Sequence, residues 1–318
     1  SETVAETLLF EGRKVSSASV RGKEGPLSLL GNHFIISTGA LHTPALLLRS
    51  GIGRAGHLKE MGIKVVSDRP GVGENLNEHP TISVSAYLRP HARLSDNLGT
   101  RRHAQIAFRY SSGIDDCPQG DMYVSVTAKS GWHALGLRLG AFLMWGNKPY
   151  SRGRVTLASA DPYAEPDVDF RLLEDRRDYD RLAQGIARMS EYFNHPLMAE
   201  IARDPFPSCY SERVRKIGAV NTKNRILTTV LATIMDGPAI LRRAAIKKFI
   251  TEGRSLAHLL GDEDAMEEFI RQGVTGCWHP SGTARMGRQD DVCAICELCD
   301  IAKHFGVIVG GAIPDSVR

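Results

Sequence analysis

The chain has 318 residues, a formal net charge of +4, 42% hydrophobic residues and 24% charged residues. This composition is ordinary for a soluble globular protein, and it excludes a chain that is disordered, collagen-like or coiled coil throughout. The small charge excess, without basic clusters, gives no reason to expect nucleic acid binding. No apolar run approaches the roughly 18 residues of a membrane span, and six cysteines are too few for a disulfide scaffold in a chain of this length.

The first 50 residues predict strands followed by a helix. Residues 7–20 read as two short strands around a turn, and a polar, Gly-rich loop follows at residues 22–26. Residues 33–37 predict a buried strand that is apolar on both faces. Pro44 then occupies the place of a first-turn helix proline, so we expect a helix to begin beside it. Strand, turn and helix together make half of an α/β unit.

Residues 51–56 spell G-x-G-x-x-G, the pattern of a dinucleotide-binding loop. Such a loop must follow a strand and open a helix, whereas this one follows the helix that begins near Pro44. We therefore interpret it as a helix stop with flexible glycines, followed by a short helix through residues 57–60. A further short strand is predicted at Val65 and Val66.

The pattern changes after Pro80. Residues 81–158 contain recurrent strand-like segments without intervening helices, which predicts an antiparallel sheet. From Leu173 the pattern becomes helical, with apolar residues at alternating spacings of 3 and 4 up to Phe193. Asp262 is expected to cap a last helix.

The elements suggest a division into two domains. Residues 1–80 and 273–318, which end in an apolar strand at 307–309, are expected to form one domain. Residues 81–272 are expected to form a second, a sheet with helices on one side. Because the chain begins at Ser1 rather than Met, we expect it to be part of a longer protein, whose signal peptide, if it has one, would not be seen here. The location we expect is cytoplasmic.

The segment from Gly276 to Gly287 reads GCWHPSGTARMG. Its histidine, His279, lies between Trp278 and Pro280, which indicates a rigid turn that presents an imidazole. Histidine has an unperturbed pKa near neutrality, so it can accept and return a proton. A hydrogen-bonded structural histidine is the alternative, and the residues themselves leave it open.

Four separated blocks resemble the glucose–methanol–choline (GMC) oxidoreductases, which are FAD-dependent. Residues 37–53, STGALHTPALLLRSGIG, are similar to the family signature S-A-G-A-x-x-S-P-x-L-L-x-x-S-G-I-G. Residues 70–80, PGVGENLNEHP, are similar to P-G-V-G-x-N-L-x-D-H-P, and residues 151–157, SRGRVTL, resemble S-x-G-x-V-x-L. The segment of His279 resembles H-x-S-G-T-x-R-M-G. The four blocks occur in the family's order along the whole chain.

The resemblance implies a fold of α/β plus antiparallel β: an incomplete, Rossmann-like FAD-binding domain with an inserted substrate domain of antiparallel sheet and helices. It implies FAD as cofactor and a small-molecule alcohol as substrate. By the same resemblance, His279 is the general base that takes the substrate hydroxyl proton while a hydride passes to flavin N5.

The resemblance also assigns the flavin contacts that this chain would retain. Ala5 matches the position that meets the adenine through its main chain. Gly39 and Ala40 follow the predicted buried strand, where small residues permit close approach. Gly311 and Ala312 are the candidates nearer the ribityl and phosphate groups.

Parts of the family pattern fall outside the chain or differ within it. The family's G-x-G-x-x-G, which holds the FAD pyrophosphate at a helix N-terminus, is expected upstream of Ser1. The Asn or His that the family pairs with its histidine is expected beyond Arg318. After the strand at 307–309 the chain reads GGAIP where the family has D-A-S-x-M-P, so the carboxylate is missing. Main-chain flavin contacts survive such a change, whereas side-chain contacts do not.

The resemblance leaves other functions open. A relative of the hydroxynitrile-lyase type would retain the flavin without a redox role, and a truncated, non-catalytic remnant would bind no FAD. An α/β-hydrolase is disfavoured because no G-x-S-x-G elbow occurs. The electron acceptor (dioxygen, a quinone or another carrier) and the oligomeric state are not indicated. If His279 is not the base, His79 is the next candidate.

Three cysteines, Cys293, Cys296 and Cys299, recur at spacings of three. With His304 they match a Cys₃His zinc set in residue type. However, zinc sites usually pair C-x-x-C with a distant second pair, and Lys303 stands where an iron–sulfur run would have its fourth cysteine. We therefore expect no metal here, and read these cysteines as small, part-buried residues.

Overall fold

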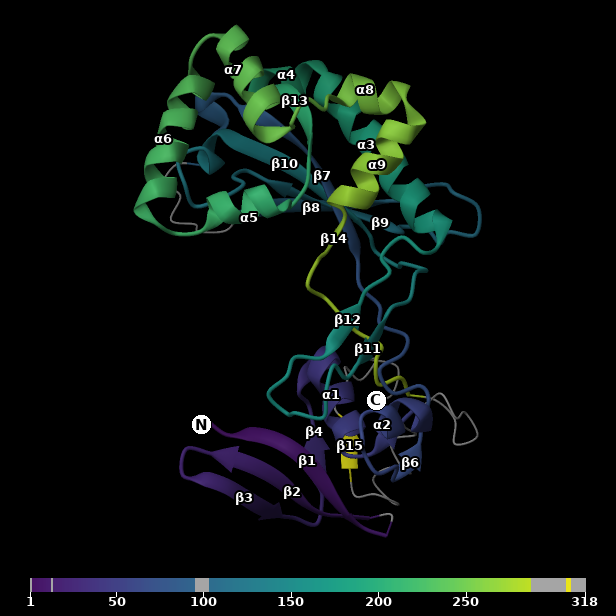
Figure 1. Ribbon diagram of the computed structural model, residues 1–318. Coiled ribbons are helices and arrows are strands. Elements are labelled where there is room, and N and C mark those ends of the chain that lie inside the picture. Colours follow the sequence, from purple (N-terminus) through teal and green to yellow (C-terminus); the bar gives the residue numbers. More distant parts are fainter. Residues whose placement is uncertain (1, 13, 95–102, 287–306, 310–318) are drawn as a thin grey trace. The chain divides into compact units, whose positions relative to one another are not determined.

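The computed structural model describes residues 2–12, 14–94, 103–286 and 307–309. The chain divides into two compact units (Figure 1): unit 1 comprises Ser1–Glu78, Arg152–Arg171 and His279–Arg318, and unit 2 comprises His79–Ser151 and Leu172–Trp278. The expected boundaries near residues 80 and 273 are close to these, but residues 152–171 fall in unit 1 rather than in the substrate domain. The reason is their pairing: residues 153–155 bond to the main chain of residues 73–76 in unit 1.

Unit 1 begins with an antiparallel sheet of β1 (Val4–Glu11), β2 (Lys14–Gly22) and β3 (Gly25–Leu30), in that order. The first two strands confirm the predicted pair around a turn. The polar stretch at residues 22–26, predicted as a loop, is instead a tight turn that leads directly into β3. Strand β3 was not predicted, because its leucines are exposed and no buried face marks it as a strand.

The strand–turn–helix of unit 1 consists of β4 (Phe34–Ile36), which pairs in parallel with β15 (Val307–Val309), and α1 (Gly39–Arg49). The predicted burial of β4 on both faces is wrong, since Ile35 is 70% exposed. A parallel strand is buried on both faces only when chain covers both of them. In the part of the chain that the structure describes, the Ile35 side is open.

The predicted start of the following helix is also wrong. Helix α1 begins at Gly39, so Pro44 lies in its interior rather than in its first turn. Proline has no N–H to donate to the carbonyl oxygen four residues earlier, which here belongs to Ala40. The helix is held mainly by burial of its residues 45–48 in the core of unit 1, which comprises Leu8, Val15, Ala18, Val20, Ile36, Ala45, Leu46, Leu47, Leu48, Ile52, Leu58, Val72 and Leu157.

The G-x-G-x-x-G stretch ends α1 and turns the chain. Gly51 has φ +84°, and a Cβ built on it would lie 2.3 Å from the carbonyl oxygen of Lys64, so only glycine fits this turn. This confirms the interpretation as a helix stop. The strand predicted at Val65 and Val66 lies two residues later, because the amides of both Val66 and Ser67 bond to the Gly51 carbonyl oxygen before pairing begins.

Short elements complete unit 1. Strand β5 (Ile52–Gly53) pairs in parallel with β6 (Ser67–Asp68), and the short helix α2 (Ala55–Glu60) lies between them in the sequence. Strands β11 (Arg154–Thr156) and β12 (Asp167–Asp169) pair with each other in antiparallel fashion.

Unit 2 is built on an antiparallel sheet, as predicted. Its strand order is β13 (Ala202–Ser208), β7 (Pro80–Leu88), β10 (Leu139–Gly146), β9 (Met122–Thr127) and β8 (Ala104–Tyr110), and β14 (Thr275–Gly276) also pairs with β7. Single helical turns occur at Pro90–Ala92 and Gly136–Arg138.

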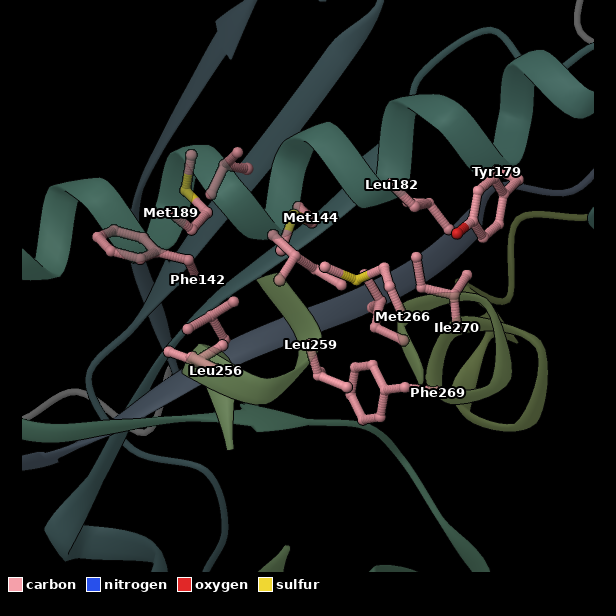
Figure 2. Packing of buried hydrophobic residues seen from close by; sticks show 14 of the residues in the cluster. Phe142, Met144, Tyr179, Leu182, Met189, Leu256, Leu259, Met266, Phe269 and Ile270 are labelled. Carbon is pink, nitrogen blue, oxygen red and sulfur yellow. The ribbon is translucent and has the colours of Figure 1, made fainter. Parts of the chain in front are cut away.

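One face of this sheet is covered by α3 (Arg176–Asn194), α8 (Leu256–Gly261) and α9 (Glu263–Gly273). Figure 2 shows side chains from these helices packed against sheet residues such as Phe142 and Met144. The predicted apolar stripe of α3 is confirmed, since Leu182, Ile186 and Met189 are fully buried. The predicted cap is confirmed as well: Asp262 accepts a hydrogen bond from the Ala265 amide at 3.0 Å.

Helices cover the other face too, which corrects the expectation of helices on one side. Successive residues of a strand point to opposite faces, so Tyr87 points away from the face to which Val84 contributes. Tyr87 packs with Leu139 and Phe206 against α6 (Thr222–Asp236), α7 (Ala239–Ala245) and the short helix η4 (Ile246–Ile250). The remaining helices are α4 (Pro196–Ile201) and α5 (Glu212–Gly218).

Candidate active site

The four sequence blocks of the resemblance come together in unit 1. Residues 73–77 lie in the middle of a cluster, paired with residues 153–155 on one side and with residues 281–283 on the other. The 281–283 segment also bonds to α1 through the side chain of Thr283, across 243 positions of sequence. Segments that are far apart along the chain therefore form one hydrogen-bonded cluster, and His279 lies at its edge.

The side of the cluster nearest His279 is a short antiparallel pairing. The amide of Asn77 donates to the carbonyl oxygen of Ser281 at 2.8 Å, and the amide of Ser281 donates back to that of Asn77 at 2.9 Å. The side-chain Nδ2 of Asn75 donates to the carbonyl oxygen of Gly282 at 3.2 Å. These bonds fix the turn that follows His279 against the second block.

The opposite side of the cluster requires close approach of two backbones. The amide of Val155 donates to the carbonyl oxygen of Gly73 at 2.7 Å, and Leu76 exchanges main-chain bonds with Gly153 at 2.9 and 2.8 Å. Gly73 has φ +83°, and a Cβ built on it would lie 2.1 Å from the Val155 carbonyl oxygen. Any larger residue would separate the second and third blocks.

The fourth block satisfies the helix bond that Pro44 cannot make. The hydroxyl of Thr283 donates to the carbonyl oxygen of Ala40 at 2.5 Å, and the Thr283 residue is only 1% exposed. Because Pro44 has no N–H, the carbonyl oxygen of Ala40 would otherwise lack the hydrogen bond that a helix normally gives it. The bond thus fastens the turn of His279 to the first turn of α1.

His279 is exposed, but its main chain is held by hydrogen bonds. Its amide N–H donates at 2.9 Å to Oε2 of Glu78, a buried residue. The preceding residue, Trp278, has φ +60°, a left-handed conformation that costs a bulky residue on the order of 1–3 kcal/mol. Pro280 restricts His279 to extended conformations. The turn is therefore held by its backbone, while the residue itself is open to approach.

The expected flavin contacts can be placed in part. Gly39 and Ala40 form the first turn of α1, next to the Thr283 bond. At Gly39, which has φ +83°, a Cβ built on the backbone would meet no atom within 4 Å, so a bound group can approach the main chain there. The described residues thus fit the edge of an FAD site. Gly311 and Ala312 lie outside the described residues.

Ala5 is not brought together with the others. It is half-buried in β1 and pairs with Val20. Leu8, three residues later, donates its amide to Ser50 Oγ just beyond α1, at 2.9 Å. In the described part of the chain, no hydrogen bond joins Ala5 to Gly39.

The other predicted candidates are accounted for as follows. His79, the alternative base, lies in unit 2, where its Nδ1 is 3.0 Å from the carbonyl oxygen of Gly146; that nitrogen therefore carries the proton and donates. The cysteines at 293, 296 and 299 lie outside the described residues. Within the ranges that the structure describes, no group of three or more His, Cys, Asp or Glu could hold a metal ion.

Sequence reasoning missed the residues that hold the turn. Glu78, Asn75 and Thr283 all lie inside the four blocks, but the resemblance assigns roles only to other residues of these blocks, such as His279 and Gly39. The signal that could have found two of them was the carboxylate of Glu78 and the hydroxyl of Thr283, each within a turn sequence and next to tightly packed residues.

Comparisons with known proteins place this geometry in a family. Family models described as GMC oxidoreductase match residues 1–81 and residues 149–309. The chain belongs to the GMC oxidoreductase family.

Individual relatives agree with this assignment. The chain is 38% identical over 303 residues to a 5-(hydroxymethyl)furfural oxidase of Methylovorus sp. (strain MP688), covering 94% of this chain and 49% of that protein. It is 25% identical over 314 residues to an oxygen-dependent choline dehydrogenase of Brucella ovis, covering 92% of this chain and 48% of that protein. The chain thus spans about half the length of these curated relatives.

Solved structures show the same fold. Pyridoxine 4-oxidase from Mesorbium loti aligns with a TM-score of 0.69 at 20% identity, covering 96% of this chain and 51% of that chain. A formate oxidase aligns with a TM-score of 0.67 at 17% identity, covering 98% of this chain and 56% of that chain.

None of the helices in the described ranges has the length and apolar character needed to cross a membrane.

Proposed function

We propose that this chain contributes to an FAD-dependent enzyme that oxidises the CH–OH group of a small alcohol, with His279 as the general base. The observation that carries the proposal is the cluster around His279. The first and second blocks bond to the turn of the fourth block, and the third block bonds to the second, while His279 itself stays exposed.

The proposed role of His279 is to accept the hydroxyl proton of the substrate on an unprotonated ring nitrogen. A histidine can do so near neutral pH because its ordinary pKa lies close to that range. Removing this proton stabilises the alkoxide character that develops at the carbinol oxygen as the C–H bond breaks. A turn fixed by its backbone holds the imidazole where a substrate can reach it.

FAD, when bound, supplies the hydride acceptor for the carbinol carbon. Gly39 and Ala40 are proposed to hold it through their main chain, because the open space at Gly39 permits close approach. Ala5 is proposed at the adenine end. Gly311 and Ala312 keep their proposed place nearer the ribityl and phosphate groups.

The relatives suggest the class of substrate and acceptor. Two of them are named for 5-(hydroxymethyl)furfural and for choline, and each of those compounds carries a primary alcohol. The names also specify an oxidase and an oxygen-dependent enzyme. We propose a small primary alcohol as substrate, with dioxygen, a quinone or another carrier as electron acceptor.

The test is made in the full-length protein that contains this chain, with 5-(hydroxymethyl)furfural, choline and simple aliphatic alcohols as a substrate panel. His279→Ala should lower the rate of flavin reduction by about 10²–10⁴-fold, the usual contribution of general base catalysis. FAD content should change little. His279→Asn should not restore the rate, since an amide does not accept the proton at neutral pH.

His91→Ala is the matched control, because His91 is an exposed histidine of unit 2 that lies outside the cluster. A wild-type rate in His279→Ala would contradict the assignment, and His79 would then be tested next. A wild-type protein that reduces no flavin with any alcohol, yet releases cyanide from a hydroxynitrile, would indicate the lyase alternative. A full-length protein without FAD would indicate the non-catalytic remnant.

A further inference from the structure

Glu78 makes an unusual contact with the candidate catalytic residue. Its residue is 4% exposed, and its Oε2 accepts the amide N–H of His279 at 2.9 Å, across 201 positions of sequence. Glu78 is the last residue of unit 1 before the chain first enters unit 2, and His279 is the first residue of unit 1 after the chain leaves unit 2 for the last time. The bond therefore joins the first and the last of the points at which the chain passes between the units.

The main chain at His279 needs such a bond. Trp278 holds a left-handed conformation, which persists only where surrounding contacts determine it. Pro280 has no amide N–H, so the amide of His279 is the donor available at this end of the turn.

The other end of the turn is held differently. Ser281 exchanges main-chain bonds with Asn77, the residue directly before Glu78. If this main-chain pairing continued to His279, the His279 amide would donate to a main-chain carbonyl oxygen. It donates instead to the side-chain carboxylate of Glu78.

We propose that Glu78 is a positioning residue for His279: its carboxylate holds the His279 amide and thereby fixes where the imidazole is presented. The inference rests on the proposed function of His279. Glu78 itself touches no reacting atom in this scheme. Its effect on the reaction passes entirely through the histidine, and this property makes it testable.

The first arm of the experiment measures the main chain without any reaction. Hydrogen exchange of the peptide that spans residues 273–286 is followed by mass spectrometry in wild type, Glu78→Ala and Glu78→Gln. Loss of the acceptor in Glu78→Ala should raise exchange of the His279 amide by roughly tenfold. Glu78→Gln keeps an oxygen acceptor and should stay near wild type.

The second arm uses flavin reduction in the full-length protein, with the alcohol of the panel that wild type oxidises fastest. Glu78→Ala should lower kcat by about 10–100-fold, because displacing a catalytic group by around 1 Å costs this much. KM and FAD content should change little. Glu60→Gln is the control, since Glu60 is an exposed carboxylate of unit 1 at the end of α2, outside the cluster.

The third arm combines the variants. If Glu78 acts only through His279, Glu78→Ala adds no further loss in a His279→Ala background, within about twofold. An equal additional loss in that background would overturn the proposal, as would unchanged exchange and kcat in Glu78→Ala, or no rescue by Gln. Failure of the proposed function looks different: His279→Ala alone would then retain the wild-type rate, whatever the Glu78 variants do.

Discussion

Replacing Thr283 with valine tests whether its hydroxyl substitutes for the helix bond that Pro44 cannot make. Valine has nearly the same shape but no hydroxyl, so Thr283→Val leaves the carbonyl oxygen of Ala40 without a partner. An unsatisfied buried acceptor costs about 1–3 kcal/mol. Since Ala40 is only half-buried, water relieves part of this cost. We therefore expect Thr283→Val to lower the local stability of α1 by about 1–2 kcal/mol, the lower end of that range.

The assay must report on unit 1 alone. A chain with two units need not unfold in one step, so a single unfolding midpoint would mix them. Hydrogen exchange of peptides from α1 (residues 39–49) reports the local opening free energy directly. A loss of about 1–2 kcal/mol should raise their exchange rates about 5–30-fold. Thr156→Val, a half-buried threonine of β11 with no described side-chain bond, serves as the control and should leave α1 unchanged.

A second substitution separates the hydrogen bond from packing. Pro44→Ala restores an N–H at position 44, which can donate to the Ala40 carbonyl oxygen in the ordinary helical pattern. In that background Thr283→Val should cost less than in wild type, by about 1 kcal/mol. Equal costs in both backgrounds, or α1 exchange unaffected by Thr283→Val, would refute the reasoning.

Three further predictions concern other parts of the chain. Asp262→Ala removes the cap of α9 and should destabilise that helix by about 0.5–2 kcal/mol, seen as faster exchange of residues 263–273, while Asp262→Asn should retain the cap. Burial raises the pKa of Tyr110 to about 12. Because the folded pKa exceeds the unfolded value, the neutral phenol contributes stability to the folded state that is complete below about pH 10 and is lost as pH rises toward 12. Spectrophotometric titration of the phenol checks this. The cysteines of residues 293–299 should bind no metal, and elemental analysis finding one zinc or iron per chain, lost on their replacement by serine, would contradict this.

The sequence predicted those elements whose burial is periodic. The stripe of α3 and the alternation of β7 and β10 repeat a local pattern, and each such pattern determines one buried face. The prediction failed where burial depends on distant chain. Ile35 lies in a segment whose apolar sequence predicts a strand buried on both faces, yet its exposure depends on which other parts of the chain cover β4. No local pattern contains that information.

The helix at Pro44 shows the same limit for hydrogen bonds. Local rules place a proline in the first turn of a helix, and they fail here because a hydroxyl 239 positions later supplies the bond that the ring removes. The second sheet face of unit 2 was missed for a related reason. Tyr87 alternates correctly in β7, but which helices cover its face depends on how residues 222–250 return to the sheet.

The cluster around His279 explains how a site can be built from segments so far apart. The described bonds in it, from Asn77 and Glu78 to the 279–283 turn and on to Ala40, connect residues of unit 1. The chain first enters unit 2 after Glu78 and leaves it for the last time before His279, and a hydrogen bond joins these two residues. Changes within the sheet and helices of unit 2 therefore need not disturb the geometry of the proposed base. On this argument, a family with this arrangement can vary the sheet and helices of unit 2 while the turn of the proposed base stays fixed.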